Sequence, residues 1–153
     1  MFIINIIGVF LKVESRFKTV KEETDKIKEK SDVATKYYKI GKVAGNYFFD
    51  NFIKYTKGKE NRIKKIFEIL NLTDYGKFEF KCISGNFINV KLTRSSLVKL
   101  CLGNERSSSY WICNWMSGFL SGLFNNVDKR WFFERSKCRE SGHNYCEFKG
   151  KIL

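Results

Sequence analysis

The sequence predicts an α+β fold, with N-terminal helices followed by strand, strand, helix, strand, strand, and an antiparallel sheet packed on the helices. Between residues 32 and 71, apolar side chains recur at three- and four-residue steps, which is the period of a helix. From Gly76 onward, short alternating segments flank turn residues, as β-hairpins do, and one further helical stretch separates the two hairpins.

The first 31 residues differ in character from the rest, and we predict one domain over residues 32–153. Residues 1–13, MFIINIIGVFLKV, are apolar but lack the basic start and cleavage pattern of a signal peptide. They are also too short to cross a bilayer. Residues 14–30 are mostly charged and predict a helical arm. We therefore expect a cytoplasmic protein without a membrane span, whose residues 1–31 form an apolar element and an exposed arm.

Two helices are expected before the first strand. Residues 32–56 predict an amphipathic helix, with a periodic set of apolar and aromatic side chains: Val33, Tyr37, Ile40, Ala44, Tyr47, Phe48, Phe52 and Tyr55. Gly41 and Gly45 lie one turn apart within it. A glycine inside a helix costs about 1 kcal/mol relative to alanine, so this pair indicates close approach of another backbone. A shorter helix ends near Asn71.

The second half of the chain predicts two hairpins around a helix. The first hairpin turns at Ser84-Gly85-Asn86, and residues 95–102 then predict a short helix. Residues 110–125 have strong helical periodicity and carry a second glycine pair, Gly118 and Gly122. Residues 127–138 and 145–152 predict the last hairpin.

The formal net charge of +13 is spread over both halves of the chain rather than gathered in one block. A dedicated nucleic-acid-binding protein usually shows a stripe or cluster of basic residues. We therefore expect a solvated basic surface and no specific nucleic-acid partner.

Five cysteines and no secretion signal argue against structural disulfides and favour metal binding or simple burial. Cys138 and Cys146 can face each other across the last hairpin, and Cys113 on the preceding helix can supply a third thiolate. A structural zinc site needs four ligands, and Glu134 or His143 can complete the set. Buried unpaired cysteines are the alternative to a metal site.

This C-terminal pattern resembles the 4-vinyl-reductase-type domain family. The residues that carry the resemblance are Cys113, the small-residue patch over residues 117–122, Glu134, Cys138, Gly142 and Cys146-Glu147-Phe148. The resemblance covers roughly residues 35–150. It implies an α+β fold shared with haem-based nitric-oxide sensors and Golgi-tethering subunits, and a role as a small-molecule sensor module.

The resemblance also implies a zinc ion held by Cys113, Cys138, Cys146 and Glu134. The family spaces its glutamate and cysteine as E-x-x-C, whereas Glu134 and Cys138 are one residue further apart. His143 therefore stays open as the alternative fourth ligand.

Aromatic side chains near the second glycine pair offer either a packed core or an apolar ligand pocket. The candidate pocket residues are Trp111, Trp115, Phe119, Phe87 and Phe133. No nicotinamide fingerprint or glycine-rich phosphate loop is present, so the sequence favours a non-catalytic domain. We expect a zinc-containing sensor of a small hydrophobic ligand, acting as a homodimer or through a partner protein. A structural adaptor subunit is the alternative.

Overall fold

The computed structural model describes residues 30–73, 76–94, 108–128, 130–138 and 143–153, without the side chains of 30–33, 82–84 and 108–111. The chain divides into two compact units, Met1–Val33 and Ala34–Leu153. The predicted N-terminal element over residues 1–31 and the predicted helix over residues 95–102 fall outside the described residues, apart from the first turn of α2.

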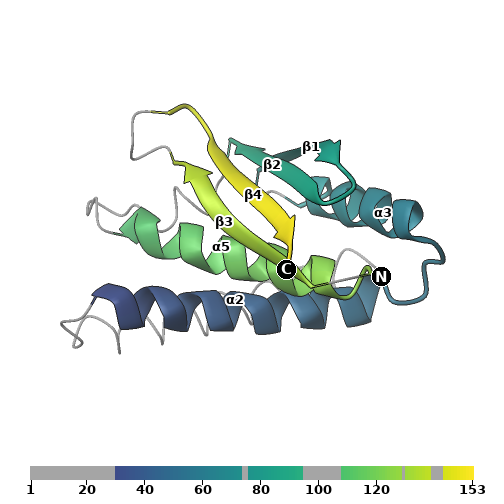
Figure 1. Cartoon of the computed structure of the whole chain (residues 1–153), viewed down its shortest axis with the longest axis horizontal. Helices are drawn as coiled ribbons and strands as arrows, with labels where there is room; N and C mark the ends of the chain where they lie inside the picture. The colour runs from purple at the N-terminus through teal and green to yellow at the C-terminus, as the bar shows by residue number, and fades with distance from the viewer. Residues whose placement is uncertain (1–29, 74–75, 95–107, 129, 139–142) are drawn as a thin grey trace. The chain divides into compact units, whose positions relative to one another are not determined.

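The observed elements confirm the α+β fold and its expected order. In chain order they are α2 (Lys30–Phe52), α3 (Lys59–Asn71), β1 (Lys77–Ser84), β2 (Phe87–Thr93), α5 (Ser108–Asn125), β3 (Trp131–Lys137) and β4 (Cys146–Ile152). Figure 1 shows α5 running beneath the sheet, with α2 alongside it.

The strands form one antiparallel sheet in the order β1-β2-β4-β3. The last hairpin therefore places β4 in the middle and leaves β3 as an edge strand. Because successive side chains of a strand point to opposite faces, one face of the sheet is apolar and covered by helices. Its central members are Ile88, Val90, Leu92 and Phe148, all at most 3% exposed.

Helices α2 and α5 run in the same direction and touch through their glycines. A Cβ atom at Gly41 would overlap the Trp115 carbonyl oxygen, and one at Gly118 would overlap the Tyr38 carbonyl oxygen. This backbone contact confirms the close approach predicted from the two glycine pairs.

A buried hydroxyl also ties α2, α5 and β3 together. Ser121 Oγ accepts hydrogen bonds from the Tyr38 hydroxyl (2.7 Å) and from the Phe133 backbone N–H (3.0 Å). It donates to the Ser117 carbonyl oxygen at 2.9 Å. Because Ser121 and Phe133 are both 0% exposed, water cannot replace the hydroxyl as the acceptor for the Phe133 N–H. Ser121 on α5 therefore provides the hydrogen-bond acceptor for the Phe133 N–H of the edge strand β3.

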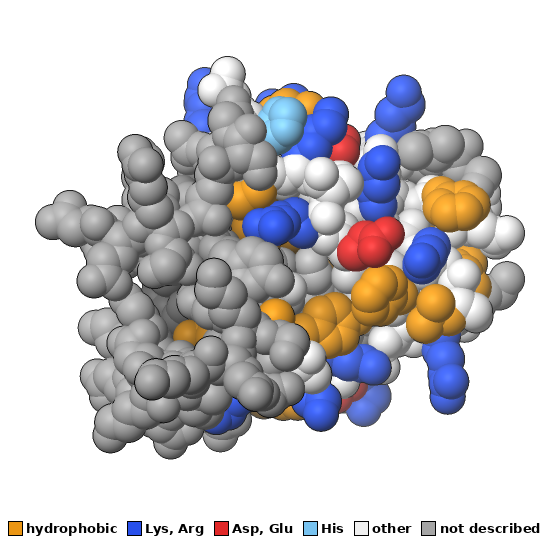
Figure 2. Space-filling view, turned by 60° about the vertical axis from the view of Figure 1, so that its left-hand side comes forward, with side chains coloured by type: hydrophobic (Ala, Val, Ile, Leu, Met, Phe, Trp, Pro, Cys, Tyr) orange, Lys and Arg blue, Asp and Glu red, His pale blue; other side chains and the backbone are white. Residues whose placement is uncertain are grey.

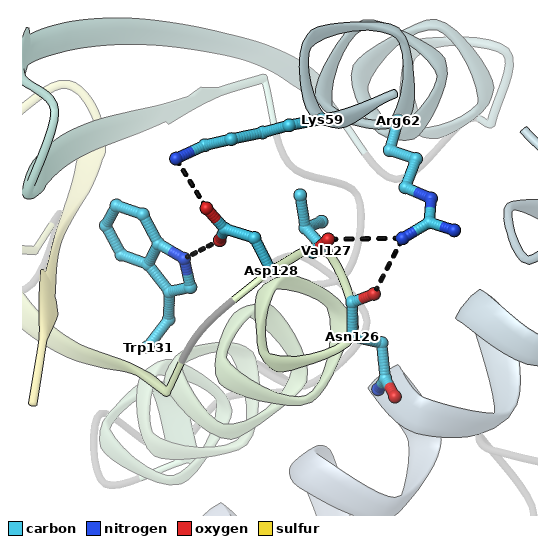
Figure 3. Close-up of polar contacts among 6 residues, drawn as sticks. All are labelled: Lys59, Arg62, Asn126, Val127, Asp128 and Trp131. Atoms are coloured by element: carbon cyan, nitrogen blue, oxygen red, sulfur yellow. Dashed lines mark hydrogen bonds and ion pairs between the residues drawn. The ribbon is translucent and has the colours of Figure 1, made fainter. Parts of the chain in front are cut away.

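The start of α3 is anchored to the end of α5 (Figure 3). The Arg62 guanidinium donates to the backbone carbonyls of Val127 (3.1 Å) and Asn126 (3.5 Å). Lys59 pairs with Asp128 at 2.6 Å, and the indole N–H of Trp131 donates to the same carboxylate at 3.1 Å. Both carbonyls belong to the turn that follows α5, so Arg62 supplies hydrogen-bond donors just beyond the end of that helix.

Two details of the predicted helix over residues 32–56 prove wrong, namely its buried face and its end. Tyr47 and Tyr55 are 48% and 88% exposed, whereas Phe49 is buried. The helix also ends at Phe52 instead of Thr56. Each helical residue turns by about 100°, so the face toward α5, set by the glycines and Phe48, leaves Tyr47 outside it.

Candidate metal centre

Three cysteines from separate elements converge at one point of the second unit. Cys113 lies on α5, Cys138 directly follows β3, and Cys146 begins β4. Their sulfur atoms all lie within 4.8 Å of one another, and the Cys113 and Cys138 sulfurs are 3.4 Å apart. All three side chains are at most 2% exposed, so the group is a buried thiol cluster.

A register shift in β3 turns Cys138 toward this cluster. Arg135 lies opposite Phe148 and Lys137 lies opposite Glu147, so Ser136 is an extra residue in the pairing. Strict alternation from Phe133 would point position 138 away from the helices. A bulge that inserts one residue reverses the faces beyond it, and Cys138 is accordingly buried with Cys146.

Neither candidate for a fourth ligand joins the sulfurs. Glu134 alternates with the buried Phe133, lies opposite Lys149 and is exposed on the outer face of the sheet. His143 is also exposed (Figure 2, pale blue). Among the described residues, the cysteines alone form a group of three or more donor side chains close enough to hold one ion.

Sequence reasoning missed Arg135, which lies beside the cluster on the inner face. Burial by itself lowers the pKa of Arg135, but attraction to the sulfurs of Cys113 and Cys138, and hydrogen bonds to them, raise it overall. The sequence carried a signal for it. The family spacing E-x-x-C puts a glutamate three residues before the cysteine, and here that position is Arg135.

Cys113 is poorly suited to nucleophilic chemistry when no metal is bound. Hydrogen bonds with Cys138 and Cys146, together with burial, raise the pKa of the Cys113 thiol well above its ordinary value. The thiolate is the nucleophilic form of cysteine, so a thiol with a raised pKa supplies little of it near neutral pH.

The donor set does fit a thiophilic metal. Zinc binds thiolate sulfur at about 2.3 Å, which puts the sulfurs of a tetrahedral site about 3.8 Å apart. The observed separations of 3.4 Å to at most 4.8 Å bracket that value. Cys113, Cys138 and Cys146 would therefore hold the ion with small side-chain adjustments.

The candidate pocket residues differ in burial, and one of them lies on the outer face of the sheet. Trp115, Phe119 and Phe133 are at most 3% exposed, and the rings of Trp115 and Phe119 stack at 5.1 Å. Phe87 is 52% exposed because Ile88, its neighbour in β2, takes the inner face. The side chain of Trp111 is not among those that the structure describes.

The charged surface is mixed. On the face shown in Figure 2, basic side chains stand among acidic, hydrophobic and other side chains rather than in a continuous block. Among the described helices, none combines the length and the apolar character needed to cross a membrane.

Known structures share this fold. The chain is similar to a trafficking protein particle complex subunit 3 from Naegleria fowleri, covalently bound to palmitic acid, at 16% identity and TM-score 0.71 over 96% of both chains. It is similar to a vinyl-4-reductase family protein from Methanocaldococcus jannaschii at 15% identity and TM-score 0.59, over 94% of this chain and 81% of that one.

A third similar structure is the phenol-responsive sensory domain of the transcription activator PoxR, solved with phenol. It is 12% identical with TM-score 0.63, over 92% of this chain and 74% of that one. No family model and no curated protein matches the sequence. At these identities the likeness establishes the fold alone, and membership of the 4-vinyl-reductase family remains a prediction.

Proposed function

We propose that the chain is a zinc-containing, non-catalytic domain that binds a small apolar or aromatic molecule. The observation that carries this proposal is the convergence of three buried thiols from α5, the end of β3 and the start of β4. The fold is shared with a sensory domain solved with phenol, which supports a ligand-binding role.

In this proposal the metal fastens the last helix to the last hairpin. Metal ligands in an unfolded chain are far apart, so the binding free energy of a structural zinc ion becomes folding free energy. Cys113 and Cys146 would then stay fixed relative to each other, and the elements that carry them would move as one body.

The ligand would contact buried aromatic side chains of α5 and β3. The buried candidates are Trp115 and Phe119 on α5 and Phe133 on β3, and Trp111 is a further candidate on α5. Ring faces and edges suit an aromatic ligand, which gains from stacked or edge-to-face contacts. Phe87 is left out because it lies on the outer face.

Native mass spectrometry together with elemental analysis tests the metal. We expect one zinc ion per chain in the wild-type protein and none in Cys113→Ser, with a lower melting temperature in that variant. Cys82→Ser, which removes a thiol of β1, should keep the metal. Purified protein without zinc, or a Cys113→Ser variant that keeps both zinc and stability, would contradict the proposal.

A structural adaptor is the second candidate, favoured by the likeness to a subunit of a trafficking complex. Val43 and Tyr47 lie one turn apart on α2 and are 61% and 48% exposed, which suits a contact with a second copy or a partner. If this contact forms a homodimer, Val43→Lys should reduce the subunit count from two to one without changing the zinc content. A monomeric wild-type protein would show that this surface does not mediate self-association.

A further inference from the structure

We propose that the outer edge of β1 binds an extended segment of a partner protein by strand addition, and that this segment carries an acidic residue between two apolar ones. β1 is the last strand in the sheet order β1-β2-β4-β3, and Figure 1 shows it at the far side of the sheet, next to α3. Strand addition uses the main-chain N–H and C=O groups of an edge strand as its binding site. The inference goes beyond the proposed function and does not depend on a bound metal.

The contacts of Phe78 show which backbone groups of β1 point away from β2. Its N–H donates to Asn71 Oδ1 at 2.7 Å, and its C=O accepts from Asn71 Nδ2 at 2.9 Å. Phe78 therefore does not exchange backbone hydrogen bonds with Leu92, the residue opposite it in β2. Because bonded and non-bonded pairs alternate along an antiparallel ladder, the next groups that point outward belong to Phe80. Within the described parts of the chain no residue bonds to the N–H or C=O of Phe80, so an added strand can use both.

The side chain of Phe80 favours an apolar residue in the added strand. Phe80 is 44% exposed, and its ring stacks on that of the buried Phe67, with centroids 4.3 Å apart and an angle of 16° between the planes. Residues directly opposite each other in paired strands have their side chains on the same face, about 5 Å apart. An apolar side chain opposite Phe80 would therefore cover a ring that Phe67 of α3 already supports.

The next residue, Lys81, favours an acidic residue in the added strand. Lys81 lies on the outer face, is exposed, and has no ion pair with any described residue. Glu79 is on the same face but already pairs with Lys77 at 2.8 Å. Since Cys82 returns to the face of Phe80, the segment that fits this edge alternates apolar, acidic, apolar.

A second copy of this chain fits the edge less well than a foreign segment. Antiparallel pairing centred on Phe80 would place Cys82 of one copy opposite Phe78 of the other, where the Asn71 side chain already bonds to the backbone. Centring the pairing on Lys81 would instead place two lysines directly opposite each other, and like charges in that position are destabilising. A short foreign segment that stops before Phe78 avoids both conflicts.

Solution NMR with a five-residue probe tests the proposal. Titrating the capped peptide acetyl-Thr-Val-Asp-Val-Thr-amide into ¹⁵N-labelled protein should shift the Phe80 amide signal in a saturable way and slow its hydrogen exchange. The Phe78 amide, which already donates to Asn71, should keep its exchange rate. Lys81→Glu should weaken peptide binding about tenfold, because an attractive cross-strand pair becomes a repulsive one. A peptide with lysine in place of the aspartate should prefer the variant to the wild type.

Lys149→Glu is the matched control, because Lys149 is an exposed lysine of β4, a strand that β2 separates from β1. It changes the net charge equally and should leave the peptide affinity unchanged. A peptide N-methylated at both valines lacks the donors for the intermolecular bonds and should not bind. A wild-type Phe80 amide that ignores the peptide, or equal affinity of wild type and Lys81→Glu, would overturn the proposal. Protection of Phe80 that grows with protein concentration in the absence of peptide would identify a second copy as the occupant and overturn the choice of a foreign segment.

Discussion

Replacing Ser121 by alanine is expected to destabilise the domain by about 2 kcal/mol, although the change removes a single oxygen atom. That hydroxyl accepts from the Tyr38 hydroxyl and the Phe133 N–H and donates to the Ser117 carbonyl. It thereby joins α2, α5 and the edge strand β3 at one buried point.

The magnitude follows from the partners that the change leaves behind. Phe133 is 0% exposed, and a buried N–H without a partner costs about 1–3 kcal/mol. The Tyr38 hydroxyl is only half-buried and can turn to water, so its loss costs about 0.5–1 kcal/mol. Alanine is a better helix former than serine by about 0.5 kcal/mol, which offsets part of the loss and leaves a net cost of about 2 kcal/mol.

Urea unfolding followed by circular dichroism, with all variants in the same metal state, measures this cost. Ser136→Ala is the matched control, because the Ser136 hydroxyl bonds to Glu147 at an exposed site. It should change the free energy of unfolding by no more than about 0.5 kcal/mol. If Ser121→Ala costs no more than Ser136→Ala, the inferred role of the buried hydroxyl is wrong.

Three further predictions concern packing and charge. Gly41→Ala should lower stability by about 2 kcal/mol in thermal unfolding, because its Cβ would overlap the Trp115 carbonyl; Gly85→Ala, with nothing within 4 Å, should have little effect. Burial raises the pKa of Tyr38, although its hydrogen bond to a serine lowers it. The folded state therefore binds more protons than the unfolded state above pH about 10. Stability should fall as pH rises through that range, and Tyr38→Phe should remove this fall in urea titrations. Arg62→Lys should cost about 1–2 kcal/mol, because the Arg62 Nε donates to the Thr56 carbonyl while an Nη donates to the Asn126 and Val127 carbonyls, and a lysine has a single nitrogen. Hydrogen exchange should show faster opening at the end of α5.

The close backbone approach at the two glycine pairs was within reach of sequence reasoning because its signal is local. Two glycine pairs with helical spacing weaken their own helices, and such a cost is usually offset by backbone contact. The structure shows the overlap that any larger side chain would cause at Gly41 and Gly118. The pairing of those two helices, by contrast, depends on which faces the sheet leaves open, and no local pattern encodes it.

The metal centre was only partly predictable for a related physical reason. Cys113, Cys138 and Cys146 were grouped from their places on the helix and the hairpin, with support from the family resemblance, and the structure brings their sulfurs together. The face of each remaining side chain depends on the extra residue at Ser136, which reverses the alternation of β3. A bulge of this kind is set by pairing with β4, so the sequence left the fourth ligand open between Glu134 and His143.

The thiol cluster and the Ser121 hydroxyl each join α5 to β3, at different positions along the helix. Cys113 and Ser121 are about 12 Å apart along α5 at 1.5 Å per residue, and they meet β3 near its end and in its middle respectively. Trp115 and Phe119 lie on the length of helix between them. If a metal binds as proposed, its loss would release the Cys138 end of the strand while the Ser121 end stays bonded, so the aromatic side chains would shift by a hinge rather than by separation of the layers. A ligand bound against those rings and the proposed metal would then be coupled through one short length of α5.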